Sequence, residues 1–237
     1  MDNRASRIDA VFARQGTGVP PARLCQTCVE ILHVSGAGVT VMSGHNVGPV
    51  CASNARVGQL EDLQFSLGEG PCHDAFTTGQ AVSEPDLERR SPEFWPHYTQ
   101  PALDLGACAV FAFPLSVGAT RIGVLTLYED TIGPLSAEQT ADSIVTADVL
   151  ARTMSSMHDR GTPPFMTDEP SEFDTHRAEV HQASGIVAVQ IGISVDEALV
   201  RIRAHAYASE TSVASVARQI VAHRLILDDD GTDTSRE

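Results

Sequence analysis

The sequence has no lysine, few aromatic residues and no long hydrophobic run. All 16 basic residues are arginines, and aromatic side chains make up 5% of the 237 residues. We attribute the missing lysine to codon usage, so it says little about mechanism. No apolar run reaches the roughly 18 residues of a membrane span, and the polar N-terminus lacks the apolar core of a signal peptide. We therefore expect no membrane segment and a cytoplasmic location.

Cysteine is also scarce, since the chain has five, an odd number. Without an export signal, this number favours reduced thiols over a disulfide framework. Cys25 and Cys28 have the CxxC spacing of redox dithiols and of half a zinc site, but no second CxxC or histidine-rich partner follows. Cys28 falls on the apolar face of a predicted helix, so we interpret both cysteines as structural. We expect neither a metal site nor a cofactor.

Charge is unevenly distributed along the chain. The net charge of −15 argues against a general nucleic-acid binder, because unspecific affinity comes from cations that neutralise phosphates. Residues 1–173 hold 21 acidic residues and 10 arginines, residues 174–227 hold five of each, and residues 228–237 hold five acidic residues and one arginine. The segment 174–227 is therefore neutral, which suits binding directed by shape and bases.

The first two thirds of the chain have the pattern of an α/β domain. Two strand-like runs, joined by a short turn around Gly118, predict a hairpin at the centre of a sheet. A long helix is predicted from Ser136, which is capped together with Gln139, through Met157. Residues 65–95 have the composition of a loop-rich section. The strand-like runs are residues 39–42, 47–53, 109–114 and 122–128.

The last third carries three short amphipathic helical patterns. Ser194 and Glu197 form a capping box, which places the start of a helix near Val195. Thr211 or Ser212 caps the next helix. Its apolar residues recur at the three-four spacing that lays one stripe along a helix. That stripe consists of Val216, Ala217, Ile220, Val221 and Leu225.

A domain boundary is predicted in a segment with three prolines, which interrupts the helices on either side. Two domains also suit the length better than one. We expect the first and last ten residues to be disordered. The predicted organisation is an N-terminal extension (1–19), an α/β domain (20–160), a proline-rich linker (161–173), an all-α three-helix domain (174–227) and an acidic disordered tail (228–237).

Several C-terminal segments carry a family resemblance: Ala183-Ser184-Gly185, Gly192-Ile193-Ser194, Glu197-Ala198, the run 199–206 with Arg203, and Val216-Ala217 with Ile220-Val221. Together they resemble the ANTAR module, the three-helix RNA-binding domain of transcription antitermination regulators, over nearly its whole length. Many members of that family have lysine where this chain has Ser184. If that lysine helps to hold the phosphate backbone, part of the affinity must come from other residues.

The N-terminal domain carries a second resemblance. Its residues are FSLGEGPC at 65–72, GQAV at 79–82, FAFPL at 111–115 and IGVLTLY at 122–128. They resemble the GAF domain, a small-molecule-sensing α/β fold, over roughly residues 20–157. The combination resembles a class of bacterial regulators. It implies a signal-responsive antiterminator that binds stem-loops of nascent RNA. We also expect a homodimer.

The candidate RNA-binding residues follow from the way folded RNA is recognised. Unstacked loop bases meet aromatic rings, arginine planes and polar edges. The alternative is that the arginines form a solvated helix face and that Tyr207 packs within the bundle. The candidates are Ser184, Arg201, Arg203, His205, Tyr207, Arg218 and Arg224.

The candidate ligand pocket of the sensor domain is mostly aromatic, as small-molecule pockets often are. Its residues equally suit the core of a domain that is poor in aromatic residues. His73, His97 and Asp74 have no spaced partners that would indicate a metal site. We expect an unknown small molecule or a protein signal at this domain. The pocket candidates are Phe65, Cys72, Phe76, Trp95 and Phe111.

Three other functions remain as alternatives. The first is enzymatic: some GAF domains reduce free methionine sulfoxide, and here Cys72 and Cys108 would have to provide the thiols. A reductase function would leave the C-terminal module unexplained, so we expect no enzyme. DNA binding is disfavoured because the third C-terminal helix begins without a cation before Arg218. A protein-interaction role stays open, since helices 136–157 and 174–191 carry apolar stripes able to pair in a dimer.

Overall fold

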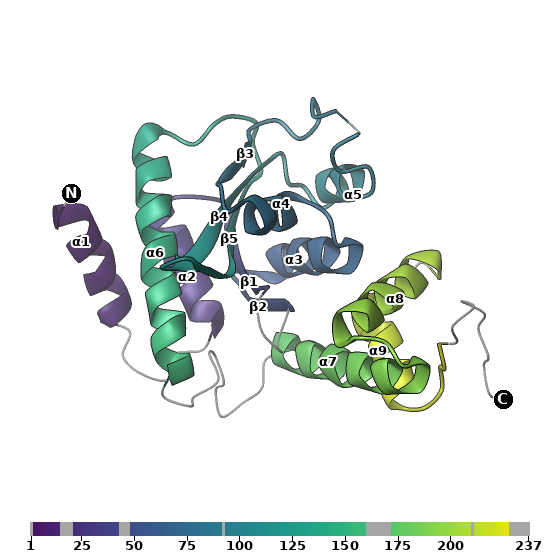
Figure 1. Cartoon of the computed structure of the whole chain (residues 1–237). Helices are drawn as coiled ribbons and strands as arrows, with labels where there is room; N and C mark the ends of the chain where they lie inside the picture. Colours follow the sequence, from purple (N-terminus) through teal and green to yellow (C-terminus); the bar gives the residue numbers. More distant parts are fainter. Residues whose placement is uncertain are drawn as a thin grey trace. The chain divides into compact units, whose positions relative to one another are not determined.

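The computed structural model describes residues 2–14, 21–42, 48–91, 93–159, 172–209 and 211–227. The chain divides into two compact units (Figure 1). The N-terminal unit comprises Met1–Phe65 and Glu69–Pro170, and the C-terminal unit comprises Ser66–Gly68 and Ser171–Glu237. Residues 161–171 of the predicted linker and the predicted tail lie outside the described residues.

Within the described residues, the N-terminal unit is built around a five-stranded antiparallel sheet of order β2-β1-β5-β4-β3. β4 and β5 pair from Ala109 opposite Glu129 to Val117 opposite Thr120. Gly118, with a φ of 60°, forms the tight turn between them. The predicted hairpin is therefore confirmed, with β5 as the middle strand. The strands are β1 (Gly36–Val41), β2 (Gly48–Ala52), β3 (Val82–Glu84), β4 (Ala109–Val117) and β5 (Thr120–Glu129).

Helices cover both faces of this sheet (Figure 1). Alternate strand residues therefore face two different environments. Phe111 and Leu125 pack in the core beside α2 and α6, whereas Ala112 and Val124 pack with Cys72 of α4. The predicted α/β fold, an antiparallel sheet flanked by helices, is confirmed. One face carries α1 (Asp2–Ala13), α2 (Pro21–Leu32) and α6 (Ala137–Asp159), and the other carries α3 (Ala55–Leu67), α4 (Pro71–Thr78) and α5 (Thr99–Asp104).

One expectation about local structure is wrong and one is incomplete. Residues 2–13 form α1 and bury Ile8 completely, so these residues are not disordered. The loop-rich section 65–95 also contains α4 and β3, and α3, which ends at Leu67, was not predicted. The periodicity of α3 is obscured because Glu61 and Gln64 lie on its buried face, where an amphipathic helix ordinarily carries apolar residues.

The expectation of five reduced thiols is also wrong. Cys25 of α2 and Cys51 of β2 form a disulfide, with their Cα atoms 6.1 Å apart and a sequence separation of 26. Both cysteines are buried where α2 packs on β2, a contact that cysteine number and spacing do not reveal. Cys28 and Cys72 are free and buried, and Cys108 is free and half-buried. Burial raises the pKa of the Cys28 thiol to about 12, which fits its structural interpretation.

The C-terminal unit contains three described helices, α7 (Glu172–Ile191), α8 (Val195–Ala208) and α9 (Val213–Val221). Ser194 and Glu197 form the predicted capping box at α8, and Ser212 caps α9 by accepting the Ser215 N–H. The apolar stripe predicted for the last helix is buried at Val216, Ala217, Ile220 and Leu225 and half-buried at Val221. No single described helix is long and apolar enough to span a membrane; Ala178–Ile191 and Val195–Ala208 reach that length only as a pair bent by 105°.

We expect the substitution Ser194→Ala to destabilise α8 by about 1 kcal/mol. It removes the hydroxyl oxygen that accepts the Glu197 N–H at 3.2 Å, and with it the hydroxyl donor that bonds the Glu197 carboxylate at 2.7 Å. Native-state hydrogen exchange of the α8 amides in the full chain measures the change. Ser194→Asp is the matched control, because aspartate also caps helices and should keep most of the protection.

Candidate functional sites: a basic helical surface and a buried carboxyl cluster

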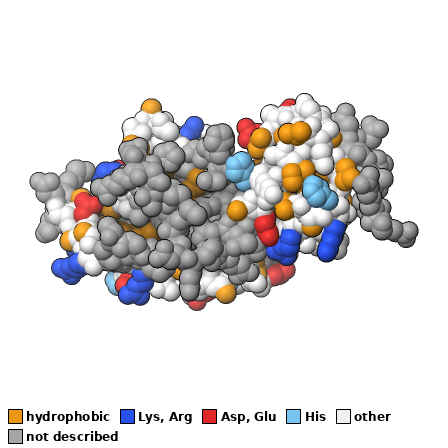
Figure 2. All heavy atoms as spheres, turned by 90° about the horizontal axis from the view of Figure 1, so that it is seen from below, with side chains coloured by type: hydrophobic (Ala, Val, Ile, Leu, Met, Phe, Trp, Pro, Cys, Tyr) orange, Lys and Arg blue, Asp and Glu red, His pale blue; other side chains and the backbone are white. Residues whose placement is uncertain are grey.

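The predicted RNA-binding residues of the C-terminal unit do not all face solvent. Arg218, Arg224 and Tyr207 are exposed, and the Tyr207 ring is 56% exposed. Arg201, Arg203 and His205 are half-buried on α8. Figure 2 shows arginine and histidine side chains lying among hydrophobic ones on the visible face of this unit. Exposed residues of both charged and aromatic type are therefore available to a ligand.

Neighbours on α8 form two pairs with a spacing of four residues. Arg201 lies one turn before His205, and Arg203 lies one turn before Tyr207. Desolvation lowers the pKa of Arg203 to about 10, which leaves its guanidinium charged at neutral pH. Each pair thus combines an arginine with a ring one helical turn away.

Ser184 has a different environment. It is 2% exposed, and its hydroxyl donates a 2.8 Å hydrogen bond to the Val180 carbonyl within α7. The helix core already satisfies this hydroxyl, and solvent does not reach it. The structure therefore gives no support to a direct contact between Ser184 and RNA.

Arg218 has an ionic neighbour on α7. Its Nε lies 3.4 Å from the Glu179 carboxylate, and both groups are partly solvated. Pairs of this kind contribute little to stability, so the arginine can exchange this carboxylate for another anion at small cost. The Arg218 guanidinium is therefore already engaged by a protein carboxylate in this structure.

The N-terminal unit contains a buried polar cluster that was not predicted. Glu61 of α3 is 1% exposed; its carboxylate accepts a 2.5 Å hydrogen bond from Thr40 of β1 and a 2.7 Å bond from the Tyr128 hydroxyl of β5. Gln64 donates to the same Tyr128 oxygen at 2.8 Å and accepts the Cys72 N–H at 2.8 Å. The sheet, α3 and α4 therefore meet in one hydrogen-bonded group.

Burial dominates the electrostatics of this cluster. Desolvation raises the pKa of Glu61 to about 7, although hydrogen bonds from Thr40 and Tyr128 oppose the shift. Desolvation, and then the Glu61 charge, raise the pKa values of Cys72, Tyr98 and Tyr128 well above their usual ranges. A protonated Cys72 is a poor nucleophile, so this geometry lends no support to the reductase alternative with Cys72 and Cys108.

The segment from Phe94 to Tyr98, which contains the aromatic residues Phe94, Trp95 and Tyr98, lies beside the cluster. The Trp95 indole N–H donates to Asp74 at 3.0 Å, and the backbone N–H groups of His97 and Tyr98 donate to one oxygen of Glu69 at 2.7 and 2.8 Å. Trp95 and Tyr98 meet edge to face with centroids 6.0 Å apart. The Arg90 guanidinium lies 3.7 Å from the centre of the Trp95 ring and also pairs with Glu84. Two carboxylates therefore hold this segment against α4.

The five predicted pocket residues do not line one cavity. Cys72 and Phe76 pack together on the α4 face, whereas Phe111 belongs to the core on the opposite face of the sheet. Phe65 and Trp95 are buried on α3 and on the segment before α5. These positions fit the core interpretation, and a ligand-binding role for the set stays a prediction. No group of three His, Cys, Asp or Glu side chains suited to a metal was found among the described residues.

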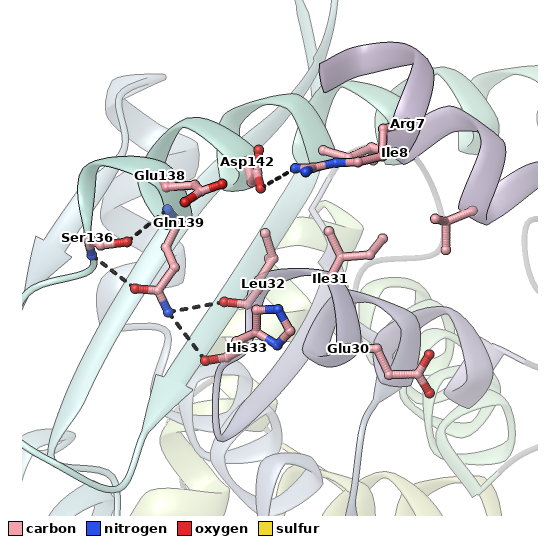
Figure 3. A pocket seen from close by; sticks show the side chains of 11 residues that line it. Arg7, Ile8, Glu30, Ile31, Leu32, His33, Ser136, Glu138, Gln139 and Asp142 are labelled. Carbon is pink, nitrogen blue, oxygen red and sulfur yellow. Dashed lines mark hydrogen bonds and ion pairs between the residues drawn. The ribbon is translucent and has the colours of Figure 1, made fainter. Parts of the chain in front are cut away.

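A surface hollow of about 620 Å³ lies between α1, α2 and the start of α6 (Figure 3). Several of its polar side chains are engaged in the fold: Arg7 bonds Asp142 at 2.8 Å, and Gln139 donates to the backbone carbonyls of Leu32 and His33. Ser136 and Gln139 form the predicted cap of α6 at its rim. These contacts close helix ends and fasten α1 to α6.

Comparisons with known proteins agree with this architecture. A model of the GAF domain matches residues 22–153, and a model of the ANTAR domain matches residues 174–221. Among solved structures, the GAF domain of an Acinetobacter phosphoenolpyruvate-protein phosphotransferase is 10% identical with a TM-score of 0.51, over 68% of this chain and 99% of that one. The corresponding domain from Coxiella burnetii is 15% identical with a TM-score of 0.51, over 67% and 96%. No curated protein matches the chain. At these identities the structural matches concern the fold alone.

Proposed function

Because the chain belongs to the GAF domain family and carries an ANTAR domain behind its GAF domain, we propose that it is a signal-responsive transcription antitermination regulator. The C-terminal unit binds stem-loops of nascent RNA, and the N-terminal unit controls that binding. The observation that carries the proposal is the match of both domain models in this order. The capped helices α8 and α9 and the exposed side chains of Arg218, Arg224 and Tyr207 support it.

RNA recognition rests on the exposed and half-buried side chains of α8 and α9. Tyr207 offers an aromatic face to an unstacked base, and arginines offer planar forks to phosphates and base edges. The unit holds equal numbers of acidic residues and arginines over 174–227, so specific contacts rather than a strong positive field supply the affinity. We leave Ser184 out of the proposed contact surface because it is buried.

We expect Tyr207→Ala to weaken the binding of a cognate stem-loop by about tenfold or more, since stacking on a base contributes roughly 1–3 kcal/mol. Titrations of the full chain at stated salt, against paired stem-loops from leaders of its own genome, measure the affinity. Phe94→Ala is the matched control, because Phe94 is an aromatic residue of the N-terminal unit that is 63% exposed. Equal affinities for wild type and Tyr207→Ala would contradict the proposed contact.

The same titration separates the alternatives. Matched duplex DNA that competes as well as RNA would favour the DNA alternative, against which the lack of a cation before Arg218 on α9 argues. Binding of neither nucleic acid, in the presence and absence of cell extract, would favour a sensor that acts through a protein partner. Free methionine sulfoxide reduction is tested directly by a reductase assay with Cys72→Ser as control.

We further propose a cytoplasmic homodimer in which a small molecule or partner at the N-terminal unit changes the exposure of the RNA-binding surface. Linkage then requires RNA to raise the affinity for the signal by the same factor. Light scattering of the full chain with and without RNA measures the oligomeric state. A monomer under both conditions would contradict the dimer while leaving RNA binding intact.

A further inference from the structure

The Glu61 carboxylate is buried without a compensating positive charge. Among the described residues, the charged side chain that acts on Glu61 is Asp62, which repels the negative charge. Buried carboxylates are ordinarily paired with a cation or kept neutral, because an isolated charge costs several kcal/mol in a protein interior. Glu61 therefore sits in an environment that favours its neutral form.

The groups that face Glu61 come from every element around it, and none of them is a cation. They are Thr40 of β1, Thr126 and Tyr128 of β5, Asp62 and Gln64 of α3, Cys72 of α4, and Tyr98 before α5. The two phenols and the thiol have pKa values raised well above their usual ranges, so they stay neutral wherever Glu61 titrates. Only Glu61 changes charge in this cluster near neutral pH.

Two glycines leave the space that the side chains of Glu61 and Gln64 occupy. A Cβ atom at Gly38 of β1 would lie 2.6 Å from side-chain atoms of Glu61, and one at Gly70 would lie 2.7 Å from Gln64. Glycine at both places lets the two polar side chains reach the sheet. The cluster therefore depends on backbone positions in β1 and before α4 as well as on its own side chains.

Tyr98 supplies a second observation that points to the same place. Its side chain is fully buried, and its hydroxyl has no hydrogen-bond partner among the described residues. The Tyr98 hydroxyl lies close enough to Glu61 and Cys72 for their charges to act on it, and close enough to the Tyr128 hydroxyl to interact with that group as well. A carboxylate has about four acceptor positions; Glu61 uses two for Thr40 and Tyr128, and the Thr126 hydroxyl interacts with it at a third. An ionised Glu61 can therefore accept the Tyr98 O–H at the remaining position as a charge-assisted bond.

We propose that Glu61 is a proton-binding input site of the N-terminal unit, and that loss of its proton to solvent draws the Tyr98 hydroxyl to the carboxylate and shifts the segment from Trp95 to Tyr98. The ligand is the hydrogen ion, and no other bond forms or breaks. Glu69 and Asp74, which hold this segment on α4, pass the shift to that helix. The site itself is independent of the proposed function, and only its effect on RNA binding rests on it.

Carbon-13 NMR of side-chain carboxyls in the glutamate-labelled full chain tests proton binding without any substitution. One glutamate should titrate with a midpoint near 7, and Glu61→Gln should remove that resonance. A wild-type protein in which every glutamate titrates below about pH 5 would overturn the proposal.

Trp95 is the only tryptophan, so its fluorescence reports the segment directly. Between pH 5 and 9 the wild type should show one transition that is absent in Glu61→Gln and retained in Asp62→Asn. Tyr98→Phe should raise the NMR midpoint, because the ionised carboxylate then lacks the bond from the Tyr98 hydroxyl, and should lose most of the fluorescence change. His97→Gln is a further control, because histidines titrate in the same range. A transition that persists in Glu61→Gln and disappears in His97→Gln would overturn the assigned movement.

RNA titrations at pH 6 and pH 8 separate this inference from the proposed function. An affinity that differs at least threefold between the two pH values in wild type, and is unchanged in Glu61→Gln, supports the coupling. Equal pH dependence in both proteins contradicts it. Absence of RNA binding at both pH values contradicts the proposed function instead. The NMR titration still decides whether Glu61 binds the proton.

Discussion

The folding stability of the N-terminal unit should fall by about 3 kcal/mol between pH 4.5 and pH 8 through Glu61 alone. The pKa of this carboxyl is raised from its ordinary 4.5 to about 7 in the folded chain. The neutral form is thus favoured by folding, and its stabilisation is complete below the unfolded-state pKa. It is lost as the pH rises to about 7 and changes no further above that, since both states are then ionised.

Urea unfolding followed by Trp95 fluorescence measures this stability, because the only tryptophan lies in the N-terminal unit. The difference in unfolding free energy between wild type and Glu61→Gln isolates the contribution of Glu61 from those of other acids. Asp62→Asn is the matched control on the same helix and should keep the wild-type slope. A difference between wild type and Glu61→Gln that is constant from pH 4.5 to pH 8 would disprove the raised pKa.

Loss of the Cys25–Cys51 disulfide should destabilise the N-terminal unit by about 3 kcal/mol. The bridge closes a loop with a sequence separation of 26, and cross-links of this length restrict the unfolded chain by about that amount. Cys51→Ala should show the loss in urea unfolding without reductant. Wild type treated with reductant should approach the stability of the variant, because both then lack the cross-link.

Cys108→Ala is the matched control, because this half-buried cysteine is free and its removal should change the stability little. Thiol titration of the denatured, unreduced wild type should find three free thiols, those of Cys28, Cys72 and Cys108. Five titratable thiols would show that the bridge does not form under the conditions used. Disulfides are rare in reducing compartments, so this count also bears on the predicted cytoplasmic location.

Features that depend on neighbours in the sequence could be predicted. The capping box of Ser194 and Glu197, the cap at Ser212 and the cap of Ser136 with Gln139 are all present. A cap joins residues two or three apart, so its geometry follows once the helix forms. The hairpin around Gly118 was predictable for the same reason, since its two strands adjoin a single tight turn.

The candidate sites were less accessible to sequence reasoning. Ser184 was placed on the RNA-binding surface by its position in a motif, whereas the packing of α7 buries it. Cys72 and Phe111 were placed in one pocket, whereas the alternation of strand β4 and the position of α4 separate them onto opposite faces of the sheet. The burial of Glu61 could not be predicted, because a glutamate in a helix ordinarily indicates an exposed face.

The sequence by itself determined the order of the two domains, the main strands of the sheet, the three C-terminal helices and their caps. These features rest on local periodicity, turn residues and motifs within short stretches of chain. Only the tertiary structure decided which cysteines join and which polar groups surround Glu61. Cys25 meets Cys51, and Thr40, Glu61 and Tyr128 meet one another, because the sheet register and helix packing bring together residues distant in sequence. No local pattern specifies such contacts, since each depends on how several elements pack at once.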